Sequence, residues 1–560
     1  MKIFDAKSMA VAIKKYGGLK AACRAAGRPY GRPERRLYAQ AVAEGLIPPL
    51  KRGGKSKEEW MNPELQFKDN MTGQVQARET RELPIPDEGV KRYLFTCAQN
   101  DTKVHEGFWT NLMAMADHYK ADLHVSRFLY IKSGLGAVGD KATMLSWKRL
   151  KELQGNDEIW WDEKVEPYLS DDRLEVAPGL VWCGEMNILP TAVRPLSGLE
   201  VYTGRKSGIF PHVKIALESV ASHKTEPTKF NYTTGTVTLR NYIQRKAGLK
   251  AAFNHCYGAL LVEVDSDGDW FCRQINADSE GVIYDLDLKF EGGEVTSGHR
   301  PEAITWGDIH VSQLENWVAD LVWEKGGILD TLKPKWQFFH DVLDFRAQSH
   351  HELKDPHKRF LRYIDGETNV RNELIEVSEF LDWAKRDWCE NVIVDSNHHH
   401  HLGRWLKEQD GRLDPSNAEL WVDLQKLSYA SIRDTSKVNY LKIGLEAIGA
   451  DLTGIKLLDE DESIILCHDR SGGIEFGDHG HSGPNGSRGN PFTLARLGRK
   501  RNVGHGHYAC IVDGVYQSGT FSDPSPDWTK GPSSWSHSFT ITYENGKRAI
   551  LTAWNGKWRA

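Results

Sequence analysis

The chain has 560 residues, of which 40% are hydrophobic and 27% are charged, and both values are ordinary for a globular protein. No apolar run approaches the ~20 residues of a membrane span, and the opening "MKIFDAKSMA" lacks the apolar core of a secretory signal. The eight cysteines form no CxxC pair, so the sequence indicates a reducing, cytoplasmic location and no disulfide framework.

Charge is distributed unevenly along the chain. The net charge is −5, yet residues 1–57 hold 14 Lys or Arg and 3 Asp or Glu, a net of +11 that leaves −16 for the rest. A basic head on an acidic body favours a polyanion as the partner of the head.

Residues 1–50 predict a small helical domain. The segment "RPERRLYAQAVAEGL" has Pro33 near its start and Gly45 at its end, as helices often do. With the shorter segments before it, this gives the outline of a basic helix-turn-helix. The alternative is a helical cap with a solvated basic face. The residues expected to contact DNA phosphates are Lys20, Arg24, Arg28, Arg32, Arg35 and Arg36.

Residues 51–90 are rich in Pro, Gly and charge, which predicts a linker. Residues 91–300 begin with a strand, a helix and a second strand in "KRYLFTCAQ", "EGFWTNLMAMADHYKA" and "DLHVSRFLYI". Further strands follow, so we expect an α/β domain, whose role the sequence leaves open. The segment "DSDGD" at 265–269 resembles part of a calcium loop, but the flanking strands favour a hairpin turn.

Residues 301–560 again alternate strands and helices. The predicted strands lie in "EAITWGDIH", "KWQFFHDVLDF", "CENVIVDSN", "SIILCHD", "GIEFGDHGH" and "RNVGHGHYACIVDG". Each strand is apolar and ends in a cluster of Asp, His or Asn. Because open α/β sheets hold their ligands at the carboxyl ends of the strands, we expect these clusters to form a site.

Five such clusters follow one another in a fixed order: Asp308-Ile-His310, His340-Asp341-Val-Leu-Asp344, Ser396-Asn397-His398, Asp478-His479-Gly-His481 and Gly504-His505-Gly-His507. This order resembles the calcineurin-like metallophosphoesterase superfamily, with its motifs DxH, GDxxD, GNH, a lone His and GHxH, and its SbcD-type nucleases in particular. The resemblance implies an α/β fold in which a C-terminal metallophosphoesterase β-sandwich, flanked by helices, spans 301–560.

The resemblance also implies a site with two divalent metal ions. Manganese is the first expectation, with magnesium, iron or zinc as alternatives. His398 would protonate the leaving group as a general acid. The implied metal ligands are Asp308, His310 and His507 for the first ion, Asn397, His479 and His505 for the second, and Asp341 as the bridge between them.

The sequence departs from the superfamily at three positions. His340 and Ser396 replace glycines, and His399 stands where an acidic residue commonly supports the catalytic histidine. Asp395 or Asp344 could supply that carboxylate. For the fourth motif His479 fits best, and His481 and His468 are the alternatives. The other histidines of the region are assigned to the surface or, at most, to substrate contact: His350, His351, His357, His400 and His401.

DNA is the expected substrate. The basic head precedes the catalytic part, and Arg496, Arg499, Lys500 and Arg501 come just before the last metal pair. As a whole, the chain resembles a DNA-degradation family of T-five-like phages, which implies a DNase in the host cytoplasm. Two alternatives remain: a DNA-binding regulatory or takeover protein with a scaffold phosphoesterase domain, and a phosphatase acting on phosphoproteins or nucleotides. Endo- or exonucleolytic cleavage, strand preference and assembly into a homo-oligomer stay open.

Overall fold

The computed structural model describes residues 5–16, 22–23, 25–26, 32–47, 80–130, 159–223, 226–469, 472–524 and 531–560. The chain divides into two compact units, Met1–Thr72 and Gly73–Ala560. In the described parts, no helix has the length and apolar character needed to cross a membrane.

The first unit contains α1 (Ala6–Tyr16) and α3 (Arg32–Ala43), which share a small core that includes Met9, Ile13 and Ala41. Arg36 is exposed on α3. Lys20, Arg24 and Arg28, three of the residues expected to contact DNA, lie outside the described residues, as do the side chains of Arg32 and Arg35. Of the expected linker, residues 51–79 also lie outside them.

The second unit opens with the β-α-β arrangement that the sequence predicts. Strands β2 (Val90–Gln99) and β3 (Asp122–Phe128) are parallel, and α5 (Glu106–Tyr119) connects them. The antiparallel hairpin of β9 (Gly258–Asp265) and β10 (Trp270–Asn276) completes a four-stranded sheet. The "DSDGD" segment forms the turn between these two paired strands, so the predicted hairpin is confirmed. Lys557 Nζ contacts three carboxylates of this turn.

An eleven-stranded sheet crosses the boundary that the sequence analysis placed at residue 300. Strand β7 pairs antiparallel with β21, which joins strands from both sides of that boundary in one sheet. An unpaired strand edge exposes a row of N–H and C=O groups, and pairing the two edges satisfies both rows. In sheet order the strands are β1 (Arg81–Glu82), β4 (Arg173–Ala177), β5 (Leu180–Cys183), β6 (Ser207–Phe210), β8 (Lys229–Thr233), β7 (Leu217–Val220), β21 (Cys510–Val512), β22 (Val515–Gln517), β20 (Lys500–Val503), β19 (Ile474–Glu475) and β18 (Ile465–Leu466).

A six-stranded sheet carries the first three clusters of polar residues. Its strands, in order, are β17 (Ile455–Leu457), β16 (Glu390–Ile393), β15 (Trp336–His340), β14 (Ala303–Asp308), β23 (Ser538–Thr542) and β24 (Arg548–Thr552). Strands β14 to β17 are parallel, and β14 and β15 are buried along almost their whole length, as expected for strands covered on both faces. A small sheet of β11 (Ile283–Asp285), β12 (Leu288–Glu291) and β13 (Glu294–Thr296) precedes it.

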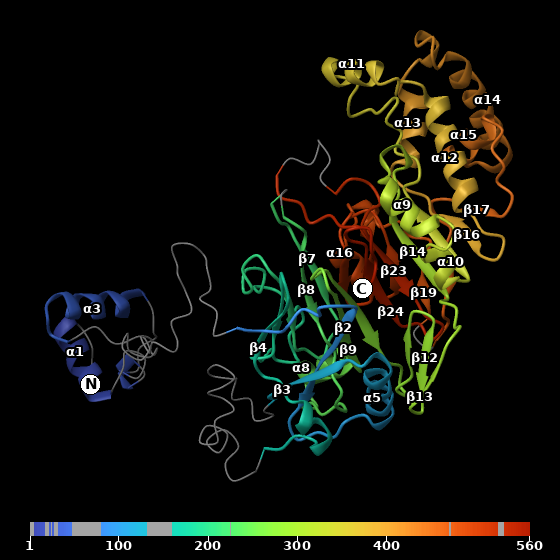
Figure 1. The fold of residues 1–560 in the computed structure, drawn as a ribbon. Helices are drawn as coiled ribbons and strands as arrows, with labels where there is room; N and C mark the ends of the chain where they lie inside the picture. The colour runs from blue at the N-terminus through green and yellow to red at the C-terminus, as the bar shows by residue number, and fades with distance from the viewer. Residues whose placement is uncertain are drawn as a thin grey trace. The chain divides into compact units, whose positions relative to one another are not determined.

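Helices connect the parallel strands (Figure 1). They are α9 (Asn316–Trp323), α10 (Ile328–Leu332), α11 (Pro356–Ile364), α12 (Val370–Ala384), α13 (His399–Glu408), α14 (Ala418–Thr435) and α15 (Tyr440–Ala447). All of these except α11, which has no buried residue, share one hydrophobic core with a face of this sheet. Two short helices lie elsewhere, α8 (Lys246–Asn254) and α16 (Pro491–Leu494). In α12, Val370, Leu374, Val377 and Leu381 recur at helical spacing and are buried.

The opposite face of the six-stranded sheet packs against the end of the eleven-stranded sheet. Phe338 of β15 stacks on Phe476, which follows β19, with 4.7 Å between the ring centroids. The mixed α/β class is therefore confirmed. Because β14, β15 and β16 are parallel, their carboxyl ends lie along one edge, and the chain after β19 and β20 reaches the same place.

A buried ion cluster in the second unit gives a test of its stability. Arg273 of β10 lies 2.6 Å from Glu263 of β9 and 2.6 Å from Asp285 of β11, with all three side chains buried. Arg273→Met would remove the ion pair of the buried Asp285 carboxylate, while Glu263 keeps Arg92 as a partner, so we expect the free energy of unfolding to fall by about 3–5 kcal/mol. Urea unfolding would measure this. Arg205→Met, which breaks an exposed pair with Glu226, should cost no more than about 1 kcal/mol, and equal losses would contradict the account.

Candidate metal centre

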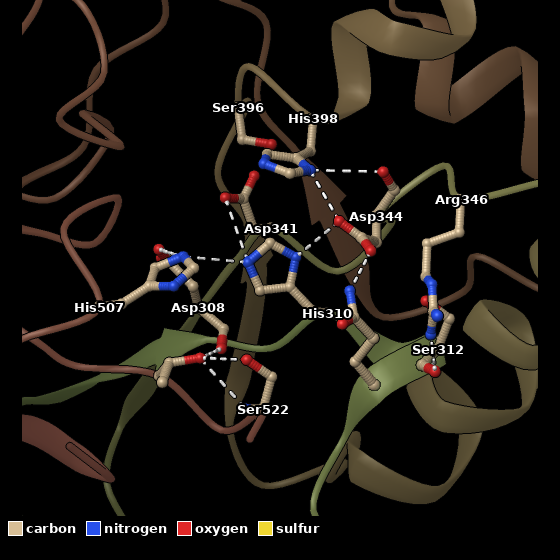
Figure 2. Close-up of polar contacts among 12 residues, drawn as sticks. Asp308, His310, Ser312, Asp341, Asp344, Arg346, Ser396, His398, His507 and Ser522 are labelled. Carbon is tan, nitrogen blue, oxygen red and sulfur yellow. Dashed lines mark hydrogen bonds and ion pairs between the residues drawn. The ribbon is translucent and has the colours of Figure 1, made fainter. Parts of the chain in front are cut away.

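The first group of potential ligands combines the ends of three strands. Asp308 ends β14, His310 follows it, Asp341 follows β15 and His507 follows β20. Each offers one ligand atom, and these atoms lie within 4.8 Å of one another. His507 Nε2 is 3.0 Å from Asp308 Oδ2 and 3.1 Å from His310 Nε2, and Figure 2 shows the His310 ring beside the carboxylate of Asp341. The structure thus brings the expected first ligand set together.

A second group shares Asp308 with the first and adds His340 and His479. His479 Nε2 lies 3.2 Å from Asp341 Oδ2, so the Asp341 carboxylate lies between the two groups, as expected of a bridge. His340 is a residue that the sequence analysis treated only as a replaced glycine. Its Nδ1 is 3.2 Å from Nδ1 of His479, and its side chain is fully buried. The sequence feature that could have identified His340 is its place in the polar cluster at the end of β15, directly before Asp341.

Asn397 and His505, the other ligands expected for a second ion, line the same cavity as Asp341. The ring centroid of His505 is 5.3 Å from that of His479. Three polar atoms here, Asp341 Oδ1, Asn397 Oδ1 and His505 Nε2, are buried and have no hydrogen-bond partner among the described residues. Since buried polar atoms are almost always satisfied, such a cluster indicates a site for cations. Carboxylate, amide and imidazole donors suit manganese, iron or zinc.

The electrostatics of the cluster also fit cations. Burial and the neighbouring Asp341 carboxylate raise the pKa of Asp308 to about 7. Burial lowers the pKa of His340 and His507 to about 4, which keeps both imidazoles neutral, the form that binds metals. Two buried carboxylates among neutral rings repel each other unless positive charge lies between them.

Backbone conformation holds several of these side chains in place. His310, Asp341, His505 and His507 have φ of 49°, 48°, 68° and 60°, in the left-handed region that residues other than glycine rarely adopt. Such conformations cost about 1–3 kcal/mol each and cluster at functional sites.

Gly504 is required by the close approach of a strand end. A Cβ at this position would lie 2.2 Å from Asp308 Oδ1. Without it, the backbone N–H of His505 donates to that same oxygen at 2.9 Å and orients the Asp308 carboxylate. The glycine of the "GHGH" segment thus fixes the shared acid of the two groups.

His398, the expected general acid, lies beside the expected metal ligands at the start of α13. Its Nδ1 is 2.9 Å from Asp344 Oδ1, a carboxylate that also contacts His310 (Figure 2). Burial opposes protonation of His398, but the Asp341 and Asp344 carboxylates outweigh it and raise its pKa to about 10. Of the two acids considered as replacements for the one missing at 399, Asp344 therefore makes the contact.

The four histidines 398–401 have four different surroundings. His399 is buried, and His400 Nε2 lies 2.7 Å from Asp395, the other acid considered. His401 contacts the ring of His398, with 4.8 Å between the centroids. At the fourth motif, His479 contacts Asp341, whereas His468 is exposed and the His481 ring centroid is 5.5 Å from that of His479.

The centre opens into a cavity of about 680 Å³. Outside the expected metal ligands and Asp344, one carboxylate (Glu352) lines the described part of its wall, beside four cationic side chains: Arg346, Lys358, Arg362 and Arg488. Lys358 and Arg362 belong to the basic and aromatic segment "DPHKRFLRY" at 355–363, which the sequence places among the motifs as a feature that favours DNA. Arg346 and Arg488 lie outside any basic run, so the sequence did not single them out. The aromatic rings of Tyr508 and Trp535 line it as well.

The basic residues at 496–501, which precede His505 and His507 in the sequence, do not line this cavity. Arg496 and Arg499 are exposed. Arg501 is 7% exposed and pairs with Asp478, so its guanidinium is not available to a phosphate, contrary to expectation. Arg501 is buried because it lies in β20, which is paired on both sides, with β19 and with β22.

The chain is similar to a known bacteriophage protein. The chain is 37% identical to Protein A1 of Escherichia phage T5 over 484 residues, which cover 84% of this chain and 83% of the relative. No family model matches the chain, and no solved structure matches it. The expected similarity to proteins of T-five-like phages is confirmed.

Proposed function

We propose that this chain, which belongs to the family of Protein A1 of phage T5, is a metal-dependent phosphodiesterase that hydrolyses DNA in the host cytoplasm. The observation that carries the proposal is the meeting of Asp308, His310, Asp341, His479 and His507 in one buried cluster with unsatisfied donor atoms. The fold, two packed sheets with helices on the outer face of one, supports a metallophosphoesterase arrangement.

Two divalent cations, manganese first, would supply Lewis-acid polarisation of the phosphodiester and a water of lowered pKa. Asp308, His310 and His507 would hold one ion, and His479 with Asn397 or His505 the other. Asp341 lies within reach of both groups. His340 extends the expected ligand set, because its Nδ1 lies next to His479.

His398 holds the proton that the leaving oxygen needs. Asp344 orients its ring through Nδ1. The other ring nitrogen is then free to point toward the substrate, since His398 lines the cavity. Proton donation to a leaving alkoxide is the ordinary role of such a positioned imidazole.

DNA is favoured over a small phosphomonoester by the wall of the cavity. Arg488 has no ion pair among the described residues, whereas Arg346 and Arg362 share Glu367. Cations spread along a wall suit a polymer with repeated phosphates. Trp535, whose ring centroid is 4.2 Å from that of His507, adds a surface on which a base can stack.

Substrate class is tested by comparing linear duplex DNA, single-stranded DNA and a phosphomonoester, each with manganese. We expect hydrolysis of at least one form of DNA and little of the monoester. Hydrolysis of the monoester alone would overturn the proposal in favour of a phosphatase. Binding of DNA without hydrolysis of any substrate would favour a regulatory protein with a scaffold phosphoesterase domain.

A further inference from the structure

Three histidines outside the metal centre meet at the wall of the cavity. His350 and His351 lie in the turn before α11, and His401 lies in the first turn of α13. The ring centroid of His350 is 3.8 Å from that of His351 and 4.6 Å from that of His401. Each offers a nitrogen, and the three nitrogens lie within 4.8 Å of one another. Two segments fifty residues apart therefore converge on one point.

Two of these rings have unsatisfied nitrogens. Nδ1 of His350 and Nδ1 of His401 are buried and have no hydrogen-bond partner among the described residues. The nearby carboxylate of Glu352 is engaged by Arg362 at 3.1 Å. The group of three therefore offers imidazole donors without a carboxylate, and its unsatisfied atoms need a partner.

We propose that His350, His351 and His401 form a zinc site that is separate from the centre at Asp341. Imidazole donors alone favour zinc over manganese or magnesium, which prefer oxygen. Three protein ligands leave the fourth position of a tetrahedral zinc open. His351 and His401 line the cavity, so that position faces the space that holds the substrate.

Helix α13 links this site to the proposed catalytic centre, because it begins with a histidine of each. His398 and His401 are three residues apart at the start of α13, which places them on one face of the helix. Their ring centroids are 4.8 Å apart. Zinc at the three histidines would thus add positive charge to the cavity wall next to the general acid, where a phosphate of the substrate can use it. The proposal rests on these residues and not on the proposed function.

Zinc content tests the site directly. The full chain is stripped with a chelator, loaded with zinc, freed of unbound zinc and measured by elemental analysis. We expect His350→Ala/His351→Ala to bind one zinc fewer per chain than the wild type. His351→Ala alone, at an exposed side chain, should show the same loss without risk to folding. The control His357→Ala, an exposed histidine of α11, should match the wild type.

A second background separates this site from the catalytic one. In an Asp341→Asn chain, which lacks the bridging carboxylate, the histidine variants should still lose one zinc. Cobalt loaded in place of zinc should lose visible absorption of a four-coordinate ion in the same variants. Unchanged zinc and unchanged cobalt spectra in both backgrounds would overturn the site. Loss of zinc in a protein that cleaves no DNA would keep the site and refute the proposed function instead.

Discussion

Asp341→Asn is expected to abolish metal binding at the centre and DNA hydrolysis with it. The substitution keeps the shape of the side chain but removes the charge that faces both His310 and His479. We expect activity to fall by more than about 100-fold, which is the loss that follows removal of a residue that only hydrogen-bonds to a metal ligand. Manganese should raise the unfolding temperature of the wild type, because an ion that binds the folded state stabilises it. The variant, which should not bind the ion at this centre, should keep the same unfolding temperature with and without manganese.

The matched control for this variant is Asp395→Asn. Asp395 follows the neighbouring strand β16 and is partly buried, but it pairs with His400 and not with the metal ligands. It should keep both activity and the manganese-dependent rise in unfolding temperature. A normal manganese response in Asp341→Asn would show that the ion binds elsewhere.

His398→Gln is expected to slow DNA hydrolysis by about 10²–10⁴-fold while metal content stays at the wild-type level. The reason is that His398 contacts Asp344 beside the expected ligands, and under the proposed function it supplies a proton and does not bind the metal. A phosphodiester with a nitrophenolate leaving group needs no proton, so its hydrolysis should suffer much less. Rates on the two substrates and elemental analysis measure the effect.

His400→Gln is the control, since His400 is the second neighbour of His398 and pairs with Asp395. It should behave as the wild type on both substrates. Equal loss on DNA and on the nitrophenyl substrate in His398→Gln would assign His398 to substrate or metal binding and not to proton transfer.

The strand ends of the centre could be predicted from sequence because each is an apolar run followed by a polar cluster. The parallel order of β14, β15 and β16 then forces Asp308, Asp341 and Asn397 to one edge. The pairing of β7 with β21 could not be predicted, since edge pairing between distant segments leaves no local pattern. That pairing is why residues on both sides of position 300 form one unit.

The contacts between particular side chains could not be predicted from the sequence either. Asp344 and Asp395 stood as equal candidates to support His398, and only the path of the chain after β15 brings Asp344 to it. Arg501 lay in a basic run that suggested a surface, yet its place in β20 buries it against Asp478. His350 and His401 meet because the turn before α11 folds over α13, a contact between segments that no spacing encodes.

The most direct test of the account is a time course in which closed circular, linear duplex and single-stranded DNA are each incubated with manganese and the purified chain, beside Asp341→Asn. The account predicts that the wild type cleaves at least one of these DNAs, that a chelator abolishes the activity, and that the variant cleaves none. Equal cleavage by the two proteins, or no cleavage of any of the DNAs by the wild type, would contradict it.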